Sequence, residues 1–133
     1  MANPLLLDIV LFLTSEGVIE GDGIDAYRDF IPEMPDCLVA ITEYKGSPEV
    51  PYEPSVHRSV QIAVRDIDAD TARSRALEIY KTILDARQEN CRVDFTDERW
   101  GQVSLRQSPF RLRTDSLDRV TYAFNMGITT TIE

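Results

Sequence analysis

The stretch HRSVQIAVRDIDADTARSRALEIYKTILDAR, residues 57–87, decides the fold. In its first part Val60, Ile62 and Val64 alternate with polar or small residues, as in a half-buried β-strand with one face pointing inward. Its second part changes to the three- and four-residue spacing of one face of an α-helix. The positions with that spacing are Ala72, Ala76, Ile79, Tyr80, Ile83 and Leu84. The stretch therefore predicts a strand followed by an amphipathic helix packed on it, which is the unit of an α+β core.

The turn between this strand and this helix contains Asp66, Asp68 and Asp70. An EF-hand calcium loop starts with the same alternation, but Thr71 stands where that loop requires glycine and Leu77 where it requires a bidentate glutamate. Acidic residues at the start of a helix also accept hydrogen bonds from free N–H groups and complement the helix dipole. We therefore predict that the aspartates cap the helix and bind no calcium.

The rest of the chain predicts further elements around the same core. They are a buried helix from Leu5 to Leu13 that ends at Gly17, a strand from Leu38 to Tyr44, an exposed proline-rich arm from Lys45 to Val56, a possible short strand from Cys91 to Phe95, a strand from Val103 to Leu112 interrupted at Pro109, and a long central strand from Val120 to Ile128. The predicted fold is a single α+β domain over residues 1–133. Two main helices pack on a roughly four-stranded, mainly antiparallel sheet, in the order helix-strand-strand-helix-strand-strand.

Composition limits the classes of function. The chain of 133 residues is long enough for one core, and its formal charge of −9 argues against tight nucleic-acid binding, which needs clustered lysine and arginine. The two cysteines, Cys37 and Cys91, form no metal-binding or redox motif, so reduced thiols are predicted. The apolar segment from Leu5 to Leu13 contains Asp8, is too short for a membrane span and lacks the basic region of a signal peptide.

No catalytic residue, cofactor or metal ligand is predicted. The single histidine, His57, is accompanied by no nucleophile motif and no cysteine cluster, so neither a catalytic triad nor a zinc site is indicated. Gly17, Gly21 and Gly23 follow a helix and lack the spacing of a phosphate-binding loop, so we assign them to a helix cap and a turn. Trp100 is predicted to pack in the core or at an interface rather than to stack on a ligand.

One long segment carries a family resemblance. The run YRDFIPEMPDCLVAITEYKGSP, residues 27–48, resembles the opening of small minor capsid proteins of tailed bacteriophages, in which a Pro-x-x-Pro-Asp segment leads to a strand and a Gly-x-Pro loop. The strand SVQIAVR at residues 59–65, the helix positions Ala72, Ala76, Ile79 and Tyr80, and the later Tyr122-x-Phe124-Asn125-Met126 are similar to the family's second strand, helix and closing strand. This family is related to the tail terminator proteins of long-tailed phages.

The resemblance implies a structural role in the virion and no enzymatic activity. Tail terminators form rings, usually of six subunits, which end tail-tube growth and join the tail to the head. The implied partners are further copies of the chain, the tail-tube protein and the head connector, without membrane or tight nucleic-acid binding. The implied location is the head-tail junction, after assembly in the cytoplasm of a bacterial host. A neighbouring head-completion or connector protein, or a small ligand-binding or enzymatic domain, are the alternatives.

Two surfaces are candidates for subunit or partner contacts. One is the proline-rich arm and the other is the arginine-bearing strand edge that follows it in the chain. The candidate residues are Tyr44, Lys45, Pro48, Pro51, Tyr52, Arg106, Arg111 and Arg113. A plain surface loop and a solvated strand edge remain the rival readings. Six copies at −9 each sum to −54, so ring formation is predicted to depend on salt or divalent cations.

Overall fold

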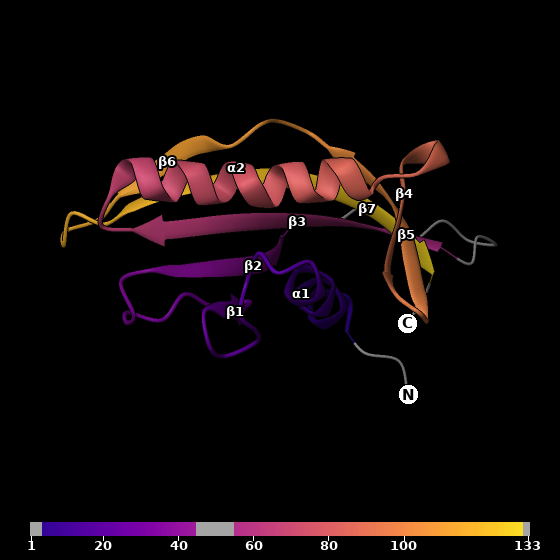
Figure 1. Cartoon of the computed structure of the whole chain (residues 1–133), viewed down its shortest axis with the longest axis horizontal. Coiled ribbons are helices and arrows are strands. Elements are labelled where there is room, and N and C mark those ends of the chain that lie inside the picture. The colour runs from indigo at the N-terminus through magenta and orange to yellow at the C-terminus, as the bar shows by residue number, and fades with distance from the viewer. Residues whose placement is uncertain (1–3, 45–54, 132–133) are drawn as a thin grey trace.

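The centre of the sheet is a pair of 12-residue strands, β3 (Ser55–Asp66) and β7 (Val120–Thr131), which are antiparallel along their whole length. The computed structural model describes residues 4–44 and 55–131, and the strands form the long middle layer of Figure 1. The other elements are α1 (Leu5–Ser15), β1 (Ala26–Arg28), β2 (Leu38–Tyr44), α2 (Ala69–Ala86), η1 (Glu89–Cys91), β4 (Arg92–Thr96), β5 (Arg99–Leu105) and β6 (Phe110–Thr114).

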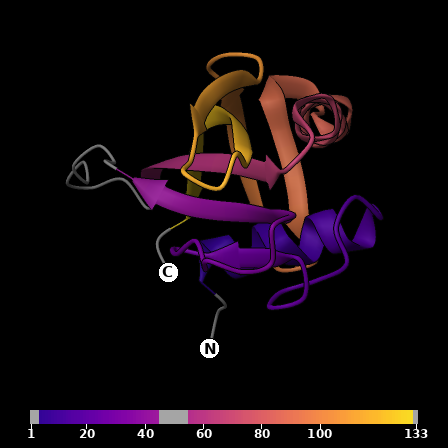
Figure 2. The same ribbon diagram turned by 90° about the vertical axis from the view of Figure 1, so that its left-hand side faces the viewer.

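The strands form one curled sheet in the order β1-β2-β3-β7-β5-β4, and β6 also pairs with β7. All pairings are antiparallel except that of β1 with β2. In Figure 2 the sheet is seen along its long strands, and β4 and β5 turn away from the plane of β2 and β3. The curl gives the sheet a concave inner face and a convex outer face.

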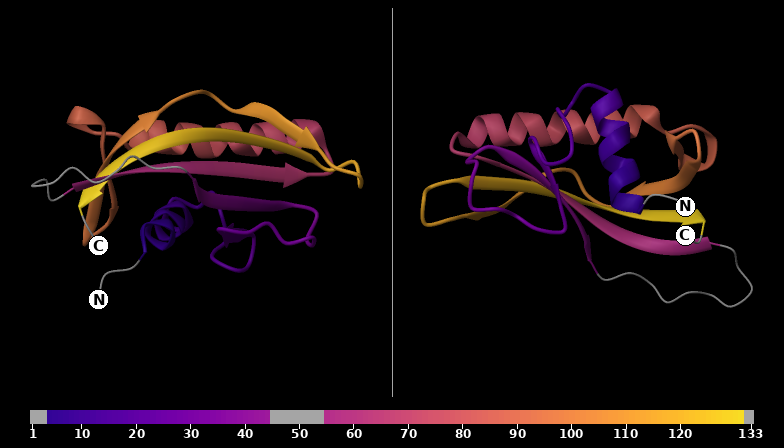
Figure 3. Two further views of the ribbon diagram at one scale, coloured as in Figure 1. Left: turned by 180° about the vertical axis from the view of Figure 1, so that it is seen from behind. Right: turned by 90° about the horizontal axis from the view of Figure 1, so that it is seen from below.

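Both helices pack on the inner face. Ile41, Ile62 and Phe124 are in register across β2, β3 and β7, and they share one buried cluster with Ile9 of α1 and Ile79 of α2. Two edge-on aromatic contacts join the helices to the sheet, from α1 to β4 with ring centroids 5.8 Å apart and from α2 to β7 with centroids 5.3 Å apart. Figure 3 shows α1 running across the direction of α2 beneath the strands. This cluster holds the two helices and the long strands together, and a second, smaller cluster is formed by Leu38, Ala40, Ala63 and Ala123.

The helix ends follow the predicted local chemistry. Gly17 has φ of +78° after the last turn of α1, where the N–H of Val18 donates to the carbonyl of Leu13 and that of Gly17 to Thr14. This is the six-to-one and five-to-two pattern of a Schellman cap, which needs a left-handed residue. At the start of α2, the Asp68 carboxylate accepts from the backbone N–H of Asp70 at 3.3 Å. The prediction that the acidic turn caps the helix is confirmed.

A buried ion pair connects α1 to the sheet. Asp8 Oδ2 lies 2.7 Å from Arg99 Nε, and both side chains are 5% exposed. The charge is therefore paired inside the core, where an isolated carboxylate is costly. The apolar run of the first helix carries its only acidic residue at the position that meets this arginine.

The predicted sheet was too small, and its order was incomplete. The sheet has seven strands and is mixed, because β1 pairs in parallel with β2. The prediction did not include β1, which is only three residues long, and it left β4 as a possible short strand. The predicted interrupted strand of residues 103–112 is two strands, which pair with successive parts of β7 on either side of Pro109. The arm was predicted to extend to Val56, but β3 begins at Ser55 and Val56 is buried.

Burial corrects one further expectation in full and another in part. β3 was predicted to be half-buried, yet Ser59 and Arg65 on its outer side are buried as well, because the strand is central and its outer face is partly covered. Trp100 was predicted to pack in the core or at an interface, and the structure excludes the core: it is 43% exposed on β5, and the guanidinium of Arg92 lies 4.5 Å from its ring centroid. Packing at an interface stays a prediction.

Candidate functional site

The outer face of the sheet carries a trough that holds one arginine. Tyr44, Ser59, Gly127 and Ser104 stand directly opposite one another across β2, β3, β7 and β5. Their small members leave room for Arg106, whose Nη2 lies 2.8 Å from the place of a Cβ on the glycine. Arg106 Nη1 donates to the tyrosine hydroxyl at 3.2 Å. The structure therefore brings together two of the predicted interface residues, Tyr44 and Arg106.

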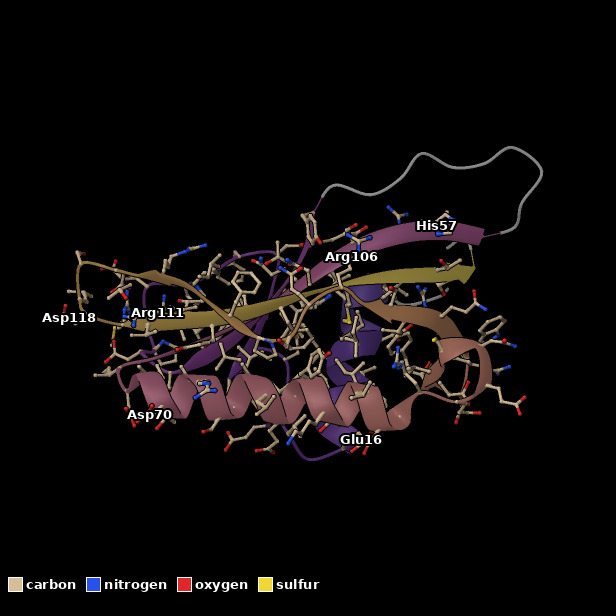
Figure 4. All side chains as sticks on the ribbon, turned by 90° about the horizontal axis from the view of Figure 1, so that it is seen from above. Glu16, His57, Asp70, Arg106, Arg111 and Asp118 are labelled. Carbon is tan, nitrogen blue, oxygen red and sulfur yellow. The ribbon has the colours of Figure 1, made fainter. Side chains whose placement is uncertain are left out.

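Polar side chains on the same face pair with each other. His57 Nδ1 and Thr129 Oγ1 are 2.7 Å apart, and Gln61 Nε2 donates to Asn125 Oδ1 at 3.1 Å. The histidine contacts a hydroxyl and no carboxylate, so the described contacts contain no acid-base pair oriented on a nucleophile. Figure 4 shows His57 and Arg106 on this upper surface, with Asp70 at the start of α2 on the other side. These groups make a polar surface on the outer face of the sheet.

A hollow of about 550 Å³ opens beside the trough. Three arginines line it, Arg58, Arg87 and Arg106, together with apolar side chains from β5 and β7. No carboxylate is among its lining residues, although the chain has 23 acidic residues. We call this site the arginine hollow. Most of this acidic protein's surface repels acidic groups, whereas the positively charged hollow attracts them. The hollow therefore favours the binding of an acidic partner.

The three arginines of the hollow differ in the groups that they contact within the chain. Arg58 Nη1 lies 3.1 Å from Glu43 Oε1 in a half-exposed ion pair. Arg87 donates to the carbonyl of Val103 at 3.5 Å, and Arg106 donates to a tyrosine hydroxyl. Within residues 4–44 and 55–131, neither of these last two guanidinium groups forms an ion pair, so each retains donors for a carboxylate.

The other predicted interface residues lie elsewhere. Arg111 and Arg113 are exposed on β6, which pairs with the first part of β7, away from the hollow. Arg111 Nη2 donates to Thr114 Oγ1 at 2.7 Å, within the same strand. The remaining candidates, Lys45, Pro48, Pro51 and Tyr52, lie outside the described residues. The sequence reasoning missed Arg58 and Arg87, which are far from Arg106 in the chain. The sequence signal that could have located this site is Gly127, because a glycine inside a strand often marks a place where another group approaches the backbone closely.

At the other end of the sheet, residues 29–37 form a loop fastened by two buried arginines. Arg65 Nη2 contacts the carbonyl oxygens of Pro32, Glu33 and Pro35 at 2.8, 3.0 and 2.7 Å, and its Nε donates to that of Asp36 at 3.3 Å. Burial lowers the pKa of the Arg65 guanidinium, and the nearby positive charge of the second arginine acts in the same direction. The loop is therefore attached to a central strand.

The second buried arginine is Arg119. It donates through Nη1 to the carbonyl of Glu33 and lies 3.4 Å from Asp36 Oδ1, while its Nε donates to Asp115 Oδ2 at 2.8 Å. The loop held in this way presents apolar side chains to solvent. Phe30 is 58% exposed, Met34 is 64% exposed, and Ile31 lies between them in the chain. We call these three side chains the apolar knob.

The described residues offer little for other classes of function. In the described ranges, no group of three or more histidine, cysteine, aspartate or glutamate side chains is arranged to hold a metal ion. No helix in those ranges has the length and apolar character needed to cross a membrane. What the geometry provides is two exposed surfaces, one apolar and one basic, at different places on a rigid sheet.

The comparisons with known proteins identify a family. Residues 12–132 match the sequence profile of a family described as bacteriophage tail terminator protein. No curated protein matches the chain. The match includes β1 to β7 and α2, and both the apolar knob and the arginine hollow lie inside it.

Proposed function

The chain belongs to the bacteriophage tail terminator family, and from that premise we propose that it is a structural virion protein which ends tail-tube growth and joins tail to head. The family match across most of the chain is the observation that carries this proposal. In the proposed role the chain forms a ring, and six subunits is the size that the resemblance implies. It acts by contact and carries out no reaction.

Ring formation requires a heterologous interface, in which one patch of a subunit meets a different patch of the next and the rotation closes. The surfaces of the described residues suit this requirement. The arginine hollow offers donors that lack a carboxylate, and the acidic side chains stand mostly on other surfaces. Charge complementarity of this kind sets orientation and register between partners.

The net charge predicts how the ring responds to salt. Copies at −9 repel each other at low ionic strength, while screening at about 0.15 M shortens the range of that repulsion to roughly 8 Å. Ring formation is therefore expected to increase with salt or with added magnesium. An acidic ring would also let DNA pass without adhering, because it has no excess of basic groups for the phosphates.

The arginine hollow is also the feature that favours the rival class, a small-ligand-binding domain, since its volume lies in the range of ligand pockets. A neighbouring head-completion or connector protein is the alternative within the virion. The test is native mass measurement across ionic strengths, with and without magnesium, followed by binding to tail tubes and to tailless heads. Rings that bind tubes support a terminator, whereas rings that bind only heads favour a connector. A monomer under every condition contradicts the ring.

A further inference from the structure

We propose that neighbouring subunits associate head to tail, with the apolar knob of one copy seated in the arginine hollow of the next. This inference rests on the proposed ring and names the contact that builds it. It is carried by three observations on the described residues, namely the exposure of the knob, the charge of the hollow, and the placement of the two at opposite ends of β3.

The knob has the properties of an anchor for a partner. Phe30 and Met34 expose more than half of their surface, although most large apolar side chains of the described residues are buried. The loop that carries them is not free to collapse, since Arg65 and Arg119 bind its carbonyls from beneath. A preorganised apolar loop loses little entropy on binding, so its burial contributes almost fully to association.

The hollow complements the knob in charge. Its apolar contact surface comes from Leu105, which is half-buried, because Val103 and Ile128 are each only 1% exposed, and its volume is about 550 Å³. The knob carries acidic neighbours, Asp29 and Glu33, which are exposed in the same loop. In the proposed contact the basic groups of the hollow therefore face acidic groups around an apolar tip. This complementarity selects a second copy over an arbitrary apolar partner.

The placement fits a heterologous contact and not a two-fold one. Arg65 holds the loop at one end of β3, and His57 lines the hollow at the other, eight residues or about 27 Å away at the rise of an extended strand. Figure 4 shows Asp118, in the turn before β7, at one end of the long strands and His57 at the other. The knob of a subunit therefore cannot reach the hollow of the same subunit. When the knob of one subunit binds the hollow of a second, the first keeps a free hollow and the second keeps a free knob. Further subunits can add at these two patches until the ring closes.

The two thiols of the chain report this contact directly. Cys37 ends the knob loop, Cys91 lines the hollow, and both are exposed. A short bismaleimide added to assembled wild-type protein is expected to link Cys37 of one copy to Cys91 of another. Mass spectrometry of the linked peptides identifies the pair. Links of Cys37 to Cys37 would indicate a two-fold contact between knobs and would overturn the proposal.

Mixing single cysteine variants sharpens the assignment. The variants Cys37→Ser and Cys91→Ser each lack one thiol, so neither alone can form the mixed link between subunits. A mixture of the two restores it, because the knob of one meets the hollow of the other. Failure of the mixture to cross-link, under conditions in which both variants form rings, contradicts the contact while leaving the ring intact.

Surface substitutions test the energetics. Met34→Glu places a charge on the knob, and Arg106→Glu reverses a charge in the hollow; each is expected to weaken association by about tenfold or more. The matched control is Leu77→Glu, which changes an exposed leucine of α2 remote from both surfaces and is expected to leave association unchanged. Circular dichroism and thermal unfolding establish that all three variants fold.

A mixture of the two defective variants separates the possible geometries. Met34→Glu keeps an intact hollow and Arg106→Glu keeps an intact knob, so the mixture is expected to form heterodimers that cannot close into rings. If either variant alone still forms rings, the head-to-tail contact is wrong and the ring proposal survives. If the wild-type chain never associates, the proposed function itself fails.

Discussion

Replacing Arg65 with methionine tests how the knob is held. Arg65 offers three N–H groups, one on Nε and two on Nη2, to four loop carbonyls at 2.7–3.3 Å. Methionine keeps much of the apolar stem and removes all three donors. Each hydrogen bond from a charged donor contributes about 1.5–3 kcal/mol when its partner stays buried. In the variant the freed carbonyls form some hydrogen bonds with water, which offsets part of the loss. We therefore expect each removed donor to lower the free energy of unfolding by about 1 kcal/mol.

The expected loss for Arg65→Met is therefore about 3 kcal/mol in the free energy of unfolding, or roughly 10 °C in Tm for a chain of this length. Urea unfolding followed by circular dichroism measures it. Arg73→Met is the control, because Arg73 is exposed on α2 and its replacement is expected to change stability by less than about 0.5 kcal/mol. A loss below about 1 kcal/mol for Arg65→Met would refute the view that this side chain fastens the loop.

Three further perturbations probe the core, the trough and the thiol chemistry. Arg99→Met is expected to cost about 3–5 kcal/mol because it leaves the Asp8 carboxylate in the core, whereas the double variant with Asp8→Leu recovers most of the loss; denaturant titration distinguishes this from simple additivity. Gly101→Ala is expected to destabilise by about 1–3 kcal/mol, since its Cβ would lie 3.0–3.2 Å from packed side-chain and backbone atoms, but Gly127→Ala meets only a flexible arginine and costs less; equal Tm losses would contradict this. Alkylation of Cys37 is expected to rise at a higher pH than that of a free cysteine peptide, because partial desolvation of this exposed thiol and the neighbouring Asp66 carboxylate raise its pKa; an unshifted pH-rate profile would argue against that environment.

The helix α2 was predictable because its signals agree with one another. The apolar stripe at three- and four-residue spacing and the acidic cap at Asp68 both placed its start within a residue or two. β2 and β7 were found for the same reason, as long alternating runs bounded by turn residues. Where local pattern and tertiary packing point to the same structure, the sequence suffices.

The remaining strands depend on pairing that no local pattern records. β1 is three residues long and is a strand only because β2 lies beside it. Pro109 divides two strands that share one partner, so the chain near it reads as a single interrupted run. Trp100 is a large aromatic residue of the kind found in cores, but it lies on β5 with 43% of its surface exposed and the guanidinium of Arg92 over its ring. Tertiary neighbours decide each of these cases.

The candidate surfaces were predictable only in part. Arg106 and Tyr44 were named from charge and from the position of the arm, and the structure places them in contact. The hollow around them draws Arg58 and Arg87 from two other elements, and no spacing in the chain relates those residues. The knob lies in the Pro-x-x-Pro-Asp segment that the family resemblance singled out, but the loop is held by Arg65, which the strand pattern placed on the face opposite the core and which is buried.

The central claim is that copies of this chain close into a ring that caps the tail tube. Negative-stain electron microscopy of the purified protein, alone and mixed with tail tubes of the phage or prophage that encodes it, tests this most directly. The account predicts closed rings in moderate salt or magnesium, and rings at one end only of each tube, with tube length no longer increasing after they bind. Single particles without rings in every condition, together with bare tube ends, would contradict it.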